Sequence, residues 1–256
     1  MLYSTSTGKG ETIVLIHGIS QSTEAWEPLI SEPVLNRYRL LSIDLPGHGN
    51  SFRSNNPERD YSLKGMAAHV KEFLNTLPDH FIVVTNSLAG NLVAEHILEL
   101  QKCKGLFLTG TSVIGEPFSL SEIAKPNPYF GATFSQNPPE DDLDGLIDTL
   151  ILAKSLKGKL KRLFKATDPA IRTELGKSIA LQDWTDEVAH LEHVSFPVAV
   201  VFGEEEEMIY PGYLSRSKVN IWTGEIIHIP GAGHCCQSDQ PGLVAELIDQ
   251  YAREVF

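Results

Sequence analysis

Short apolar runs alternate along this chain with segments whose apolar residues recur every three or four positions. The apolar runs predict strands near residues 12–16, 39–43, 81–85, 104–109, 197–202 and 225–229, with one further small strand around Leu2–Ser6. The periodic segments 63–77, 88–100 and 241–254 predict amphipathic helices that pack on a sheet. This alternation is typical of parallel strands joined by right-handed crossovers, so we expect an α/β fold with a mostly parallel central sheet flanked by helices.

The alternation stops between residues 112 and 194. Here Leu143–Leu152, Leu156–Phe164 and Ala170–Leu181 predict short helices without intervening strands. The preceding segment carries Pro126, Pro128, Pro138 and Pro139, which favour extended or turning backbone. We therefore expect one core made of residues 1–111 and 195–256, with a helical insertion at 112–194.

Ser87 stands where an apolar run passes into a predicted helix, in the sequence Thr85-Asn86-Ser87-Leu88-Ala89-Gly90. A sharp turn between strand and helix would push its hydroxyl into a pocket. A serine before a helix is more often a simple N-cap, so this segment predicts little by itself. Its value depends on the other signals in the chain.

Three more motifs follow other predicted strands. They are His17-Gly18-Ile19, the stretch Asp44-Leu45-Pro46-Gly47-His48-Gly49-Asn50-Ser51, and Gly231-Ala232-Gly233-His234 just before the last helix. In this order, the chain resembles the α/β-hydrolase superfamily over nearly its whole length outside residues 112–194. The layout looks most similar to small serine hydrolases with a helical cap, including a group that opens acyl-homoserine lactones. The resemblance implies an α/β-hydrolase fold in which residues 112–194 form a cap that selects the substrate.

Nucleophilic catalysis by a serine needs a base within hydrogen-bond reach and a partner that orients the base. His234 is the best candidate base, because the glycines before it permit a loop that brings the imidazole toward the strand ends. His17 and His48 also lie in the matching motifs, where the resemblance implies that they shape loops.

The acid must come from the run Glu204-Glu205-Glu206-Glu207, which contains no aspartate. The family usually places this residue three positions after the strand-ending glycine, which indicates Glu206, and about four before a proline, which indicates Glu207. We favour Glu206, because Gly203 ends the strand directly, and keep Glu207 as the alternative. At least two of the four glutamates are expected to be solvated, because four adjacent carboxylates cannot all be buried.

These residues predict a serine hydrolase that cleaves a small carboxylic ester or lactone through an acyl-enzyme, with the backbone amides of Ile19 and Leu88 as oxyanion donors. A serine at position 87 argues against haloalkane dehalogenases and epoxide hydrolases of this fold, which use aspartate there. Thr85 and Ala89 stand where the family usually has glycine, and the branched Thr85 could crowd the turn. The alternative is therefore a ligand-binding receptor or binding protein of the same fold with little or no turnover.

Composition limits the remaining possibilities. A formal net charge of −12 argues against nucleic-acid and anionic-membrane partners, and leaves a small molecule as the expected partner. The start of the chain lacks a signal-peptide pattern and no stretch suits a bilayer, so we expect a cytoplasmic protein. Monomer and homodimer both remain open.

The three cysteines, Cys103, Cys235 and Cys236, do not suggest a disulfide framework or a zinc site, and packing is their expected role. His190 and His193 lie three apart on a predicted helix without accompanying ligands, so a solvated helix face is expected. No metal or organic cofactor is implied.

Overall fold

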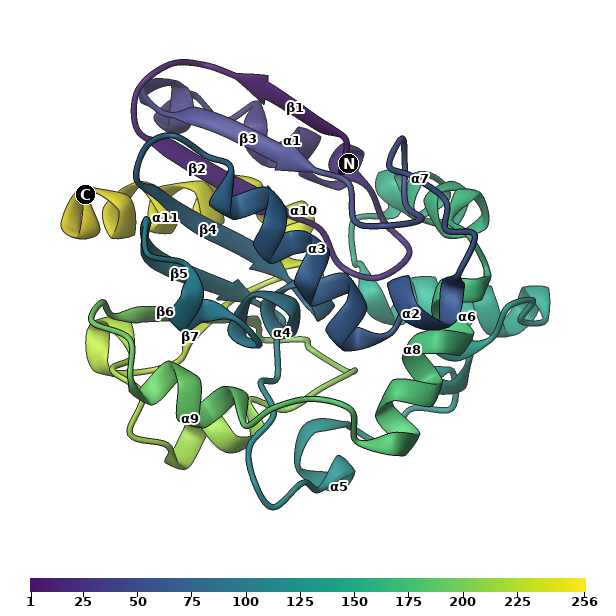
Figure 1. The fold of residues 1–256 in the computed structure, drawn as a ribbon. Coiled ribbons are helices and arrows are strands. Elements are labelled where there is room, and N and C mark those ends of the chain that lie inside the picture. The colour runs from purple at the N-terminus through teal and green to yellow at the C-terminus, as the bar shows by residue number, and fades with distance from the viewer.

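The computed structural model describes residues 1–256, and its centre is a seven-stranded sheet (Figure 1). The strands are β1 (Ser4–Thr7), β2 (Thr12–Ile16), β3 (Arg39–Ile43), β4 (Phe81–Asn86), β5 (Cys103–Thr109), β6 (Val198–Gly203) and β7 (Ile227–Ile229). They are ordered β1-β3-β2-β4-β5-β6-β7, and every neighbouring pair is parallel except β1 with β3. The predicted α/β architecture with a mostly parallel sheet is confirmed.

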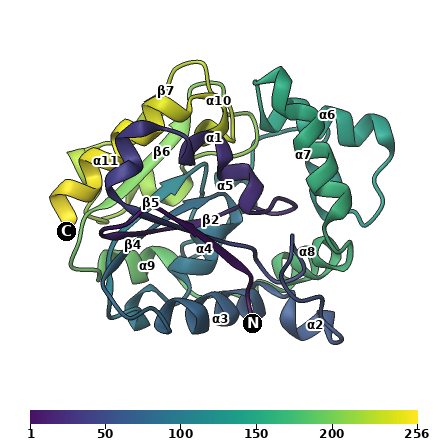
Figure 2. The ribbon, with the colours of Figure 1, turned by 90° about the horizontal axis from the view of Figure 1, so that it is seen from above.

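Helices cover both faces of this sheet (Figures 1 and 2). One face carries α3 (Leu63–Asn75) and α4 (Leu88–Ala94), while the other carries α1 (Glu27–Ile30) and α11 (Pro241–Val255). Every residue of β2, β4 and β6 is buried, because both faces of the central strands contact helices. This explains why these strands are continuous apolar runs in the sequence.

Shorter elements complete the core. The short α-helices are α2 (Pro57–Asp60) and α10 (Cys236–Asp239), and the 3₁₀ helices outside residues 112–194 are Thr23–Trp26, Pro33–Arg37, Ile97–Glu99, Gly212–Arg216 and Trp222–Gly224. No helix is both long and apolar enough to cross a bilayer.

Residues 112–194 contain no strand of the sheet. Their helices are α5 (Leu120–Ile123), α6 (Glu140–Leu150), α7 (Lys154–Ala166), α8 (Ala170–Leu181) and α9 (Glu187–Glu192), with a 3₁₀ helix at Phe130–Phe134. Helices α6, α7 and α8 lie to one side of the sheet in Figure 2, whereas α9 packs beside α4. The three helices predicted in this region are confirmed, although α6 and α7 each begin earlier than expected.

One helix prediction was wrong in its length. The segment 88–100 is not one helix: α4 ends at Ala94, and a 3₁₀ turn, Ile97–Glu99, follows. The break occurs where α9 packs on the end of α4, because the Ala94 carbonyl accepts a hydrogen bond from Nδ1 of His190 at 3.0 Å. The apolar periodicity of the sequence continues past Ala94. It could not show where the helix ends, because the contact is made by His190, which lies 96 positions further along the chain.

Candidate active site

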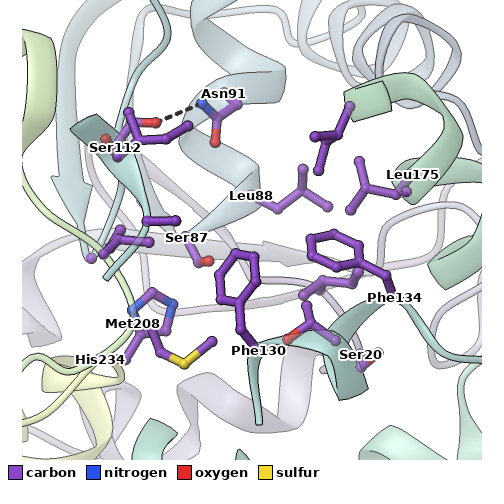
Figure 3. A pocket seen from close by; sticks show the side chains of 18 of the residues that line it. Ser20, Ser87, Leu88, Asn91, Ser112, Phe130, Phe134, Leu175, Met208 and His234 are labelled. Carbon is purple, nitrogen blue, oxygen red and sulfur yellow. Dashed lines mark hydrogen bonds between the residues drawn. The ribbon is translucent and has the colours of Figure 1, made fainter. Parts of the chain in front are cut away.

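Ser87 occupies a strained turn between β4 and α4. Its backbone lies at φ 53° and ψ −126°, a region that residues with a side chain rarely adopt and that is often found at functional sites. The Ser87 amide is held by the Thr109 carbonyl at 2.9 Å. Gly18 backs directly onto the turn, since a Cβ at this position would lie 3.2 Å from Cβ of Ser87. The turn therefore presents the Ser87 hydroxyl to the cavity (Figure 3).

Thr85 fits into β4 without disturbing the sheet. It is fully buried and pairs in register with Ile16 on one side and Leu108 on the other. Its hydroxyl lies 3.5 Å from the Phe107 carbonyl. The regular pairing on both sides shows that Thr85 does not displace β4 from the sheet.

Glu206 and His234 form a buried pair beside this turn. Oε2 of Glu206 lies 2.7 Å from Nδ1 of His234, and the two residues are 5% and 4% exposed. The other carboxylate oxygen accepts the amides of Met208 at 2.7 Å and Ile209 at 3.2 Å. An ionised carboxylate only accepts hydrogen bonds, so Nδ1 of His234 must be the donor, and Nε2 is the acceptor when the imidazole is neutral.

The environment keeps Glu206 ionised. Burial alone would raise the pKa of its carboxyl, but the charge and hydrogen bond of His234 and the two backbone amides lower the pKa below its usual value. Glu207 is exposed and makes no hydrogen bond to His234. Of the two glutamates that the sequence left open, the structure brings only Glu206 to the imidazole.

The two histidines of the upstream motifs hold loops. Nε2 of His17 accepts the Leu45 amide at 3.1 Å, and Nε2 of His48 accepts the Ser20 amide at 2.9 Å. Both rings are fully buried, and burial lowers the pKa of each histidine. Neutral imidazoles are therefore available as acceptors, as expected for residues that shape loops.

The amides of Ile19 and Leu88 are free to bind a ligand. Leu88 is the first residue of α4, where an amide has no partner within the helix, and the Ile19 amide donates to no group of the chain. Both residues line the same cavity as Ser87 and His234. Two unpaired donors at one cavity can stabilise negative charge that develops on an oxygen.

Three residues that the sequence did not single out fix the loop that carries His234. Nδ2 of Asn86 donates to the His234 carbonyl at 3.3 Å, Oε2 of Glu205 accepts the Ala232 amide at 2.9 Å, and Oδ2 of Asp239 accepts the Gly233 amide at 2.9 Å. Asn86 lies beside the candidate nucleophile Ser87, and Glu205 lies in the glutamate run that was searched for the acid. Asp239 carried no sequence signal beyond its position shortly after His234.

The cavity above Ser87 is apolar. Its volume is about 420 Å³, and 18 of its 27 lining residues are hydrophobic. Phe130, Phe134, Leu175 and Met208 form part of the wall around Ser87 and His234 (Figure 3). No Asp, Glu, Lys or Arg lines it, and more than half of the lining residues come from the segment 112–194.

The three cysteines, His190 of α9 and His193, which follows the end of α9, differ in their exposure to solvent. Cys103, Cys235 and Cys236 are free and buried, and burial raises the pKa of each thiol. His193 is exposed as expected, but the expectation of a solvated face was wrong for His190, which is half-buried against the end of α4.

Comparison with known proteins agrees with this fold. A model described as "Alpha/beta hydrolase family" matches residues 13–247. The chain belongs to the alpha/beta hydrolase family. It is therefore a hydrolase by family, and the fold implied by the sequence motifs is confirmed.

Two solved structures share the fold closely, although they are distant in sequence. One is the N-acyl homoserine lactonase AidH in complex with N-butanoyl homoserine, with a TM-score of 0.91 at 23% identity, covering 99% of this chain and 93% of that one. The other is an aryl esterase from Burkholderia cenocepacia, so named provisionally, with a TM-score of 0.81 at 16% identity, covering 99% and 94%.

A relative of known reaction matches at a similar distance. The pimeloyl-[acyl-carrier protein] methyl ester esterase of Nitrosomonas europaea is 24% identical over 241 residues, covering 90% of each chain.

Proposed function

We propose that this protein is a serine hydrolase that cleaves a small carboxylic ester or lactone. Ser87 attacks the carbonyl carbon while Nε2 of His234 takes its proton, and His234 then passes the proton to the departing alkoxide. Water repeats this sequence on the acyl-enzyme, which releases the acid and restores Ser87. Glu206 orients the imidazole and stabilises its charged form, and the amides of Ile19 and Leu88 bind the oxyanion.

One observation carries this proposal. The buried hydrogen bond between Glu206 and Nδ1 of His234 leaves Nε2 as a proton acceptor at the cavity where the Ser87 hydroxyl is presented. A neutral imidazole within hydrogen-bond reach would activate the serine, whose hydroxyl is otherwise a weak nucleophile. The reactions of the lactonase and esterase relatives also support cleavage of a carboxylic ester or lactone.

The cavity favours an uncharged substrate with an apolar acyl part. An apolar lining without ionisable groups other than His234 offers no partner for a buried charge, whose transfer from water would be costly. We therefore expect kcat/KM to rise with acyl length while the chain still fits, by about fourfold per methylene, which corresponds to about 0.8 kcal/mol.

Residues 112–194 are proposed to act as the cap that selects the substrate. They supply more than half of the cavity lining, while Ser87, His234 and the oxyanion donors come from the core. Changes in this segment should therefore alter acyl preference more than the reactivity of Ser87.

Hydrolysis of p-nitrophenyl acetate and butyrate and of N-butanoyl homoserine lactone tests the proposal. Ser87→Ala should lose activity by at least about 10³-fold with the protein still folded. Ser42→Ala is a matched control, because Ser42 is a buried serine in β3 whose hydroxyl has no hydrogen-bond partner, and it should keep full activity. Equal slow rates for wild type and Ser87→Ala would reject catalysis by Ser87 and favour the ligand-binding alternative.

A further inference from the structure

The loop that carries His234 is fastened to the junction between α6 and α7. The Cys235 amide donates to the carbonyl of Leu150, the last residue of α6, at 2.9 Å. On the other side of His234, the Gly233 amide donates to Oδ2 of Asp239 at 2.9 Å. The residue after His234 therefore binds the junction directly, and the residue before His234 binds Asp239.

Asp239 completes the connection with its second oxygen. Oδ1 accepts the amides of Leu152 at 2.9 Å and Ala153 at 2.7 Å, immediately before α7 begins at Lys154. No cation lies within ion-pair distance of this carboxylate, so its partners are three backbone amides. Hydrogen bonds to a charged acceptor are roughly twice as strong as neutral ones.

An asparagine cannot make the same contacts at this position. Both carboxylate oxygens accept from amides, so an asparagine would keep one acceptor and turn an NH₂ group toward an N–H donor. The side chain is half-buried in α10, where solvent can replace the lost partners only in part. Asp239→Asn therefore weakens the connection without adding bulk.

The junction also belongs to the wall of the cavity, because Leu146 and Leu150 of α6 line it together with His234. We propose that Asp239 is a positioning residue for the reaction, which couples the α6–α7 junction to the loop of His234 so that the imidazole keeps its place at Ser87. This inference rests on the proposed hydrolase function. Asp239 itself does not line the cavity and touches no substrate.

Steady-state kinetics per active site test this role. Asp239→Asn should lower kcat for p-nitrophenyl butyrate by about 10- to 100-fold, because a displacement of about 1 Å costs about 10²-fold, while KM changes less than threefold. The endpoint of fluorophosphonate labelling at Ser87 counts the folded sites. A purely structural role would reduce that endpoint and leave kcat per labelled site unchanged, which would overturn the proposal.

Asp249→Asn is the matched control. Asp249 is a buried aspartate of α11 whose Oδ1 accepts a hydrogen bond from the Tyr38 hydroxyl at 2.9 Å. Asp249 does not line the cavity. This variant should lose stability but keep kcat per labelled site. Asp239→Glu retains the charge with a longer side chain, and a fall in kcat smaller than that of Asp239→Asn is expected.

Hydrogen exchange of the wild-type protein provides a test that needs neither a folded variant nor activity. The amides of Gly233, Leu152 and Ala153 should exchange with one common opening rate, because they bind one carboxylate. Independent opening of Gly233 and the two junction amides would overturn the coupling. A wild type that exchanges as expected but hydrolyses no ester would reject the proposed function instead.

Discussion

Nδ1 of His234 donates to Glu206 across 2.7 Å, and both side chains are buried, with neither more than 5% exposed. The adjacent Glu207 is exposed, although it differs from Glu206 by a single position in the chain. One residue of this loop thus lies against the imidazole while its neighbour faces solvent.

This contrast gives the first prediction. Glu206→Gln should lower kcat by roughly 10²- to 10⁴-fold, because an amide stabilises neither the required tautomer nor the charged form of His234. Glu207→Gln should change kcat by no more than about twofold, as for surface substitutions in general. Both are measured with p-nitrophenyl butyrate, and a larger loss in Glu207→Gln would assign the acid to the neighbouring residue.

Thr85→Gly is expected to weaken the fold without improving catalysis. Thr85 is fully buried and pairs regularly with two strands, so glycine would remove packing and add flexibility to the unfolded chain. The free energy of unfolding should fall by about 1 kcal/mol or more, with kcat within about twofold of wild type. Urea unfolding and ester hydrolysis check both parts, and a marked gain in kcat would mean that Thr85 does strain the turn.

Gly18→Ala should impair turnover through contact with the turn at Ser87. A Cβ at position 18 would meet Oδ1 of Asn86 at 3.1 Å and Cβ of Ser87 at 3.2 Å, so the turn formed by these two residues must give by a few tenths of an ångström. We expect a loss of about tenfold in kcat, less than the 10²-fold that a 1 Å displacement can cost.

Gly158→Ala is the control for this substitution. Gly158 lies within α7, and nothing stands within 4 Å of the new Cβ. The change should stabilise the protein by about 0.5–1 kcal/mol and leave kcat unchanged. If Gly18→Ala is as active as this control, Gly18 does not constrain the turn.

Glu187 should make stability depend on pH. It is fully buried in α9, where burial raises the pKa of its carboxyl well above the usual 4.5, although Oε2 accepts the amide groups of Asn91 and Ile114. The folded state therefore binds this proton more tightly than the unfolded chain. The contribution of Glu187 to the free energy of unfolding is fully present below its pKa in the unfolded chain. It is lost as the pH rises toward its pKa in the folded state.

Glu187→Gln removes this dependence and keeps an oxygen that can accept both donors. Its free energy of unfolding should exceed that of wild type by more at about pH 8 than at about pH 5, as measured by urea unfolding. Glu11→Gln, at an exposed position, should follow wild type at both pH values. A constant difference between Glu187→Gln and wild type would show that Glu187 does not titrate in this range.

The sequence by itself determined the alternation of strands and helices and nominated Ser87 and His234. Burial on both faces of a parallel sheet demands apolar runs, and a tight turn between strand and helix leaves a local pattern around Ser87. Such features depend on neighbours a few positions apart, and a single chain displays them directly.

Tertiary structure decided what depends on residues distant in the chain. It brought Glu206 rather than Glu207 to His234, ended α4 at Ala94 against His190, and gave Asp239 its three amide partners. The physical reason is the same for all three. Burial and hydrogen-bond geometry arise only when separate segments pack together, and the local sequence does not specify which distant segment a residue will contact.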